Sequence, residues 1–381
     1  MKRIYLDHNA TTPMAPSVQE AMLPFIAEHY GNPSSNHSMG RAACEAVEDA
    51  RMHVASVLAA DRDELFFTSG GTEANNLALM GSMLDDDMPL KGHIVTTQIE
   101  HPAVAEPIRQ LEKWGMEVTW LPTNRQGVIT AAQVEAAIRG DTRLVSIMHA
   151  NNETGVIQPL ADISPLLRDR EILLHSDASQ SFGKIPTSVD ELGVDLLSIA
   201  AHKCYGPKGM GALYSRFGTQ LRPCMYGAGH ERGLRPGTEN VPAIVGFGQV
   251  CRLLQTQLAE AGQKLERLRD RLLGQLLKGV TGLTVNGQDS ERLPNTLSVV
   301  FPGVRGHELL ARVPEICAST GSACHSGSTA VSAPLANLGL SREEAQGTVR
   351  FSVGWYNNEE EIDRAADLMC SAWEELSNGS F

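Results

Sequence analysis

A lysine and an aspartate follow two neighbouring apolar runs in the middle of the chain. Asp177 closes the run Ile172–Ser176. Lys203 comes just after the run Leu196–Ala200. If these runs are adjacent strands, their ends present the amine and the carboxylate to one cleft. A lysine can hold pyridoxal phosphate (PLP) as a Schiff base, and an acid can keep its pyridine nitrogen protonated. The alternatives are a helix-capping aspartate and a solvated surface lysine.

A glycine turn stands between an apolar run and a stretch of helical character. The sequence TSGGTE, Thr68–Glu73, follows Leu65–Phe67 and precedes Ala74–Met80. Backbone N–H groups at such a helix start, together with the helix dipole, suit a phosphate group. The commoner use of the same residues is a plain turn with a threonine cap, and this alternative stays open.

A cysteine lies in a run of small and polar residues near the C-terminus. Cys324 belongs to STGSACHSGS, Ser319–Ser328, a composition typical of a loop. An ordinary thiol has a pKa of about 8.5, so a neighbour such as His325 would have to favour the thiolate. The alternative is an incidental surface cysteine. The chain has seven cysteines without a CxxC pair, which argues against a disulfide framework and against a metal site.

The elements that must position these residues alternate in type. Short apolar runs such as His93–Thr97, Leu144–His149 and Gly211–Ser215 are separated by stretches of helical period. This alternation predicts an α/β fold whose central sheet is mostly parallel, with ligands at the carboxyl ends of the strands.

A long helical region, Pro242–Lys278, is expected to link two domains. The alternative is two consecutive helices broken near Gly262. Three further apolar runs after this region, Leu283–Asn286, Leu297–Phe301 and Thr348–Val353, predict a smaller α+β domain.

Composition and charge narrow the class of protein. The 381 residues are 42% hydrophobic and 20% charged, as in soluble globular proteins. The formal net charge of −13 disfavours direct nucleic-acid binding through bulk charge. The start of the chain lacks the apolar stretch of a signal peptide, and no apolar run reaches the ~20 residues of a membrane helix. We therefore expect a cytoplasmic protein that does not enter a membrane.

Taken together, these segments resemble the cysteine desulfurases, which are class V members of the aspartate-aminotransferase fold family. The resemblance runs from Tyr5 to about Ala366. It rests on the motifs YLDHNATTP, GNPSS, FTSGGTEANNLAL, EHPAV, SIMHANNETGVIQP, HSDASQSFGK, AHKCYGPKGMGALY, GHERGLRPGTEN, STGSACHSG and VRFSVG, in this order along the chain.

The resemblance implies a fold type I PLP enzyme that works as a homodimer. A large PLP-binding domain would comprise residues 15–255, and a small domain would comprise residues 1–14 and 256–381 and carry the cysteine loop. The large domain would contain the mostly parallel central sheet.

The resemblance also implies roles around the cofactor ring. Lys203 would bind PLP and later move the Cα proton of the substrate. Asp177 would pair with the pyridinium nitrogen, and Gln180 would donate a hydrogen bond to the phenolate oxygen. His101 would stack on the ring and assist proton transfers.

The remaining implied roles concern phosphate, substrate and sulfur. Gly71, Thr72 and His202 would hold the phosphate, with Thr238 reaching over from the second subunit. Asn152 and Arg350 would hold the carboxylate of the substrate L-cysteine. Cys324 would take its sulfur.

The implied activity converts L-cysteine to L-alanine and leaves the sulfur as a persulfide on Cys324, for transfer to an acceptor protein. Iron-sulfur assembly, tRNA thiolation and DNA sulfur modification remain open as destinations. One alternative is selenocysteine lyase, because ACHS at 323–326 and RPGTEN at 235–240 also resemble that branch. Another is a non-catalytic PLP-binding platform for sulfur relay.

Two departures from the family pattern stand out. Ala200 replaces a common serine, which removes one hydroxyl contact to the phosphate. The segment AVSAPLANLG, residues 330–339, differs from the sequence that the housekeeping desulfurases of iron-sulfur-cluster assembly have there. The spacing from Cys324 to Arg350 is nevertheless that of the long-loop group of desulfurases.

Overall fold

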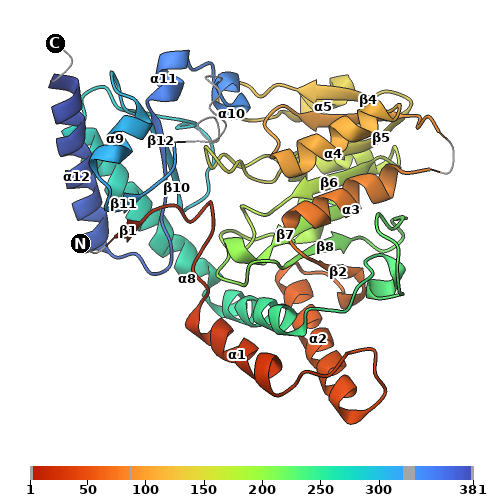
Figure 1. Cartoon of the computed structure of the whole chain (residues 1–381). Helices are drawn as coiled ribbons and strands as arrows, with labels where there is room; N and C mark the ends of the chain where they lie inside the picture. The colour runs from red at the N-terminus through yellow and green to blue at the C-terminus, as the bar shows by residue number, and fades with distance from the viewer. Residues whose placement is uncertain (1–2, 86–87, 321–330, 379–381) are drawn as a thin grey trace.

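A computed structural model of the chain describes residues 3–85, 88–320 and 331–378 (Figure 1). Its larger part is built around a seven-stranded sheet with the order β2-β8-β7-β6-β5-β3-β4. The strands are β2 (Leu65–Thr68), β3 (His93–Thr97), β4 (Glu117–Leu121), β5 (Thr142–Ser146), β6 (Leu173–Asp177), β7 (Leu196–Ala200) and β8 (Gly211–Ser215). Within the described sheet, β8 is antiparallel to both its neighbours, and the other adjacent pairs are parallel. The predicted α/β fold with a mostly parallel sheet is confirmed.

Helices cover both faces of this sheet, because successive strand residues are buried on opposite sides. Ile94 packs with α3 (Gly71–Met83) and α4 (Pro102–Lys113), whereas its neighbour Val95 belongs to the main core. The main core also receives α1 (Pro16–Ala27), α2 (Ser38–Val57), α5 (Ala131–Ala137), α6 (Leu160–Arg168) and α7 (Val189–Leu192). Such two-sided burial explains why the strands read as continuous apolar runs in the sequence.

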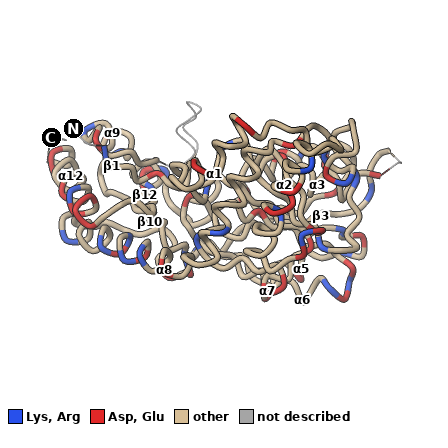
Figure 2. The backbone as a smooth tube through the Cα atoms, turned by 90° about the horizontal axis from the view of Figure 1, so that it is seen from below, with Lys and Arg blue, Asp and Glu red and all other residues tan. Residues whose placement is uncertain are grey.

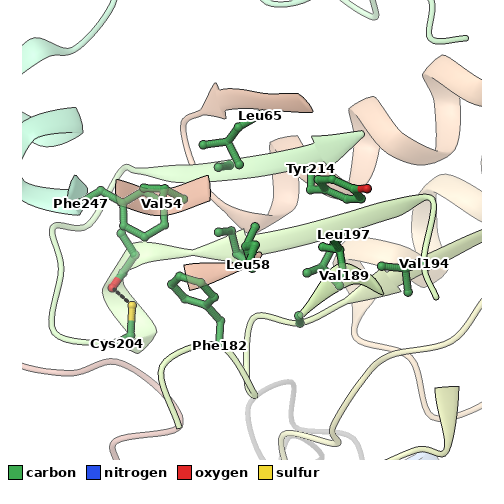
Figure 3. Packing of buried hydrophobic residues seen from close by; sticks show 14 of the residues in the cluster. Val54, Leu58, Leu65, Phe182, Val189, Val194, Leu197, Cys204, Tyr214 and Phe247 are labelled. Atoms are coloured by element: carbon green, nitrogen blue, oxygen red, sulfur yellow. Dashed lines mark hydrogen bonds between the residues drawn. The ribbon is translucent and has the colours of Figure 1, made fainter. Parts of the chain in front are cut away.

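Figure 3 shows part of the main core from close by. Side chains from three strands, Leu65, Leu197 and Tyr214, lie in one cluster with Phe247 and Phe182. The rings of Phe182 and Phe247 meet edge to face with centroids 5.9 Å apart, a favourable aromatic geometry. This packing fixes the turn after β6, on which part of the candidate site is built.

The long helix α8 (Val241–Gly279) is continuous, so the alternative of a break near Gly262 is wrong. Its first half contributes apolar residues from Val241 to Leu254 to the main core. Its second half contributes Leu265, Leu268, Leu272 and Leu276 to a second core. Figure 1 shows α8 running from the large sheet-bearing part to the smaller part of the molecule.

The smaller part is built from both ends of the chain. A three-stranded antiparallel sheet contains β9 (Thr284–Val285), β10 (Thr296–Val300) and β12 (Thr348–Ser352). The N-terminal β1 (Ile4–Tyr5) pairs with β11 (Ile316–Cys317). The helices are α9 (Gly306–Arg312), α10 (Ala333–Asn337), α11 (Arg342–Gln346) and α12 (Glu359–Asn378). The exact domain boundaries given above remain a prediction.

Charged residues of both signs are interspersed over the two parts of the molecule (Figure 2). Among the helices of residues 3–85, 88–320 and 331–378, none combines the length and apolar character that crossing a membrane requires.

Candidate active site

A cavity of about 260 Å³ lies beyond the carboxyl ends of β6 and β7. Parallel α/β sheets bind ligands at this edge, because the loops that leave the strands diverge there. Eight of the residues singled out from the sequence line it: Gly71, Thr72, His101, Asn152, Asp177, Gln180, His202 and Lys203.

Lys203 ends the short 3-10 turn η2 (Ala201–Lys203), directly after β7. Its Nζ donates to the backbone oxygens of Asn9 at 2.6 Å and Ala10 at 2.9 Å. Burial, together with the positive charge of Arg350, lowers the pKa of this amine to about 8. A larger fraction is therefore neutral and nucleophilic near pH 7 than for an exposed lysine.

The residue after Lys203 anchors the turn in the core (Figure 3). The Sγ of Cys204 donates to the Ala201 oxygen at 3.3 Å. Burial raises the pKa of this thiol to about 12, so it stays protonated and inert. Cys204 is thus a packing residue, as a small buried cysteine usually is.

Asp177 is the last residue of β6, and both of its carboxylate oxygens accept hydrogen bonds. Oδ2 accepts from Asn75 Nδ2 at 2.8 Å, and Oδ1 accepts from the Ser179 backbone N–H at 2.8 Å. These contacts hold the carboxylate in one orientation at the cavity wall. Asn75 was not singled out from the sequence, although it lies in the FTSGGTEANNLAL motif and comes from α3.

The glycine turn after β2 leaves space that a side chain would fill. A Cβ added at Gly71 would lie 2.8 Å from Ser179 Oγ and 3.5 Å from the Ala200 Cβ. Gly71 is the first residue of α3, whose free N–H groups begin at this point. A helix start beside an open cradle fits a phosphate group. Ser179 also brings a hydroxyl close to the place where Ala200 lacks one.

His101 caps the start of α4. Its Nδ1 accepts from the Ala103 backbone N–H at 3.1 Å, so the neutral ring carries its proton on Nε2. Burial lowers the pKa of His101, which keeps the imidazole uncharged. A flat neutral ring on the cavity wall is suited to stacking against an aromatic cofactor.

The carboxyl group of Glu100, the residue before His101, is buried behind the cavity wall. It accepts from Thr97 Oγ1 at 2.8 Å and from the Met148 backbone N–H at 2.9 Å. Burial raises the pKa of this carboxyl to about 8. Glu100 therefore remains largely protonated near neutral pH.

Gln180 follows β6, and both ends of its amide are engaged. Nε2 donates to the Asn9 backbone oxygen at 3.0 Å, and Oε1 accepts from Lys184 Nζ at 2.9 Å. Within the part of the chain that the structure describes, the second N–H of the amide makes no hydrogen bond, so it is left for a ligand. Lys184 was not singled out from the sequence, because an isolated lysine is normally a surface residue.

Arg350 reaches the site from β12 in the smaller part of the molecule. Its Nη1 donates to the Asn152 backbone oxygen at 2.8 Å, and its Nη2 donates to Asp7 Oδ1 at 2.7 Å. A guanidinium has five N–H donors, so these contacts orient it and leave capacity for a second carboxylate. The structure thus brings Arg350 and Asn152 together, as their predicted shared role requires.

Three more predicted site residues, His202, Thr238 and Cys324, differ in where they lie relative to the cavity. His202 lines the cavity, and its Nδ1 lies 3.1 Å from Thr11 Oγ1. Burial lowers the pKa of His202 to about 4, with the charge of Lys203 adding to the shift, so it is a neutral ring. Thr238 is exposed and is not part of the cavity lining of its own chain. Cys324 lies outside the described residues.

The donor set fits PLP. It combines an amine of lowered pKa, an oriented carboxylate, a helix start with an open cradle and a neutral imidazole. Within the described residues, no cluster of three histidine, cysteine, aspartate or glutamate side chains suits a metal ion.

Comparisons with known proteins agree with this site. The aminotransferase class-V family model matches residues 4–365. A cysteine desulfurase IscS of Dictyoglomus turgidum is 44% identical over 97% of this chain and 94% of its own. A solved NifS-like protein superposes with a TM-score of 0.90 and is 40% identical, with 99% and 100% of the two chains covered. The solved SspA in complex with cysteine gives a TM-score of 0.81 and 36% identity, with 93% and 99% covered.

These matches span nearly the whole chain and include the strands, turns and helix starts that line the cavity. The chain therefore belongs to the class V aminotransferase family and, within it, to the cysteine desulfurases.

Proposed function

We propose that this cysteine desulfurase holds PLP in the cavity around Lys203 and passes sulfur from L-cysteine, through a persulfide on Cys324, to an acceptor protein. The observation that carries the cofactor proposal is the convergence of the Lys203 amine and the oriented Asp177 carboxylate on one cavity beside the Gly71 cradle. When bound, PLP supplies an electron sink for the bonds at the substrate Cα.

The residues that would hold the cofactor come from several strand ends. Lys203 would bind it covalently, and the Asp177 carboxylate would face its ring nitrogen. The start of α3 at Gly71 and Thr72, together with His202, would bind its phosphate. His101 would lie against the ring face, and Gln180 would offer its remaining N–H to the ring oxygen.

Lys203 is also suited to move the Cα proton. A general base works best when its pKa lies near the operating pH, and the pKa of Lys203 is about 8. When it is not engaged in holding the cofactor, the Lys203 amine could take the Cα proton and later return it. His101, with its proton on Nε2, can donate at the same site.

The substrate carboxylate would bind between Arg350 and Asn152, where Arg350 is already oriented by Asp7. The Cys324 thiolate would then attack the substrate sulfur. An S–S bond forms as the carbon–sulfur bond breaks, and the carbon skeleton keeps the electron pair of that bond and leaves as alanine after protonation. The sulfur stays on Cys324 for transfer.

A homodimer and a cytoplasmic location complete the proposal. Thr238 is exposed and does not line the cavity of its own chain, which supports a role in the phosphate site of a second chain. The side chains of Phe217 and Tyr226, in the segment that leads to Thr238, are 92% and 85% exposed, and a second chain would cover them. A cytoplasmic location is supported by the need of persulfide chemistry for reduced thiols.

Alanine release from L-cysteine tests the function. The PLP-loaded chain is compared with Cys324→Ala in the presence of a thiol reductant, with Cys44→Ala as a matched control because Cys44 is an exposed free cysteine. We expect release to be lost in Cys324→Ala alone. Equal release from all three proteins would refute the persulfide step and would instead fit a lyase that needs no enzyme thiol.

A further inference from the structure

Lys184 is a buried lysine that contacts Gln180, a residue of the cavity lining, and the proposed reaction assigns it no role. It is only 6% exposed. Among the ion pairs of the described residues, none joins its Nζ to a carboxylate within 4.0 Å. Burial, together with the nearby charges of Lys203 and Arg350, lowers the pKa of this amine well below its ordinary value. A buried amine without a counter-ion is costly, so packing alone does not account for it.

The contacts of the Lys184 amine define its action. Nζ donates to Gln180 Oε1 at 2.9 Å and to Asn9 Oδ1 at 3.3 Å. Nζ has N–H groups to donate whether it is protonated or neutral, and both of its contacts are to side-chain oxygens, so it faces the oxygen end of the Gln180 amide. Lys184, at the oxygen end, and the Asn9 backbone oxygen, at the nitrogen end, together set which way round the amide lies.

The nitrogen end of that amide consequently lies near the reactive amine. Gln180 Nε2 donates to the Asn9 backbone oxygen at 3.0 Å, the same oxygen that accepts from Lys203 Nζ at 2.6 Å. Gln180 lines the cavity, and within the described residues its second N–H makes no hydrogen bond. This N–H is available to a group that occupies the cavity.

The side chain of Asn9 is itself held in one orientation. Oδ1 accepts from Asn295 Nδ2 at 3.0 Å as well as from Lys184. Nδ2 donates to Thr296 Oγ1 at 2.9 Å and to the Asn152 backbone oxygen at 3.3 Å. Turning either amide would place donor against donor and acceptor against acceptor, so the network has one low-energy arrangement.

We propose that Lys184 is a positioning residue of the active site, which holds the Gln180 amide with its nitrogen toward the cavity. The ring oxygen of a bound cofactor would then meet an N–H donor. With the amide turned round, the same oxygen would face a carbonyl oxygen, and attraction would become repulsion. This inference rests on the proposed function, since its ligand is PLP.

A double-mutant cycle tests the coupling between Lys184 and Gln180. The dissociation constant of PLP is measured by absorbance titration of the cofactor-free chain, Lys184→Met, Gln180→Ala and the double variant. Lys278→Met is the matched control, because Lys278 is exposed near the end of α8. We expect Lys184→Met to weaken binding about tenfold, as the loss of one hydrogen bond would. In the Gln180→Ala background its effect should be less than about twofold.

A second readout separates positioning from a general effect of charge. Loss of a donor to the ionised ring oxygen should move the pH midpoint of the bound-PLP absorption band upward in Lys184→Met. In the Gln180→Ala background the same substitution should leave the midpoint where it is. An equal shift, or an equal loss of affinity, in both backgrounds would overturn the inference, because Lys184 would then act without Gln180.

The design distinguishes this inference from the proposed function. Failure of the unmodified chain to bind PLP would refute the cofactor site itself, whereas binding without coupling would refute only the role of Lys184. If Lys184→Met does not fold, Lys184→Gln takes its place in the cycle, since it keeps N–H donors at a shorter reach. We expect it to lose less affinity than Gln180→Ala does, and a larger loss would overturn the inference.

Discussion

Replacing Arg51 by methionine should destabilise the protein strongly, because Arg51 holds a buried carboxylate. Arg51 lies on α2, and its Nη1 and Nη2 donate to the two carboxylate oxygens of Glu231 at 2.8 Å each. The two side chains are 5% and 2% exposed. Arg51 also donates to the Leu65 backbone oxygen at 3.0 Å and lies over the Phe67 ring at 4.7 Å. It thus ties the segment that contains Glu231 to β2.

The magnitude follows from what Arg51→Met leaves behind. Among the described residues, the Phe67 backbone N–H, at 2.8 Å, would be the one donor left to the buried Glu231 carboxylate. Removing one partner of a buried ion pair costs about 3–5 kcal/mol. For a denaturant slope of about 3 kcal/mol per M, the urea midpoint should fall by roughly 1–1.7 M.

Urea unfolding followed by far-UV circular dichroism measures this change. Arg62→Met is the matched control, because Arg62 is 59% exposed and pairs loosely with Asp63 at 4.0 Å. Its effect should stay within about 0.5 kcal/mol. Adding Glu231→Gln to Arg51→Met removes the stranded charge and should restore at least half of the loss. An Arg51→Met effect below about 1 kcal/mol, or no recovery in the double variant, would refute the reasoning.

Three further predictions concern the cavity. The initial rate of PLP uptake by the cofactor-free chain should rise about tenfold per pH unit below pH 8 and level off above it, because the pKa of Lys203 is about 8; a rate still rising at pH 10 in stopped-flow absorbance would contradict this. The folded-state pKa of Glu100 is raised to about 8 from 4.5, so its carboxyl destabilises the fold progressively as pH rises from 4.5 through 8. Glu100→Gln should accordingly melt higher than the parent at pH 9 but not at pH 4, and equal differences at both pH values would count against it. Asn75→Ala should weaken PLP binding several-fold in the same titration, because the Asp177 carboxylate loses the donor at 2.8 Å; unchanged affinity would show that this contact does not orient the acid.

The strands could be read from the sequence to a large extent. His93–Thr97, Leu196–Ala200 and Gly211–Ser215 were predicted with the bounds that the structure gives them. These strands are fully buried, so both faces carry apolar residues and the run itself marks the element. The predicted run Leu144–His149 begins two residues later than β5 (Thr142–Ser146) begins. It ends three residues beyond the end of β5, because Ile147 and Met148 are buried in the loop that leads to the cavity.

The long helix was predicted, and the break at Gly262 was wrong. A glycine inside a helix costs only about 1 kcal/mol relative to alanine. Apolar residues on either side of Gly262, such as Leu254 and Leu265, are buried in two different cores and keep the helix continuous across it. Tertiary packing therefore outweighs the local preference.

The residues that sequence reasoning missed owe their importance to contacts between distant parts of the chain. Lys184 donates to Asn9 Oδ1 and Asn75 donates to Asp177 Oδ2, and these contacts join segments that are 175 and 102 residues apart in the chain. Single residue types carry no such signal, since a lysine or an asparagine is normally exposed. The individual roles of the site residues stay predictions until they are tested.

Because the two halves of α8 are buried in two different cores, the rotation of one half about the helix axis relative to the other must be kept. Between Leu254 and Leu265 the helix belongs to neither set of fully buried apolar residues. One residue inserted there would turn the smaller part of the molecule by about 100° and shift it by about 1.5 Å. Arg350 belongs to the smaller part, and its Nη1 donates to the Asn152 backbone oxygen at 2.8 Å. The rotation would move Arg350 out of reach of Asn152. The number of residues in this stretch of α8 thus sets the rotation of the smaller part relative to the large sheet, and with it the position of Arg350. Insertions there should be tolerated only when they add nearly whole helical turns.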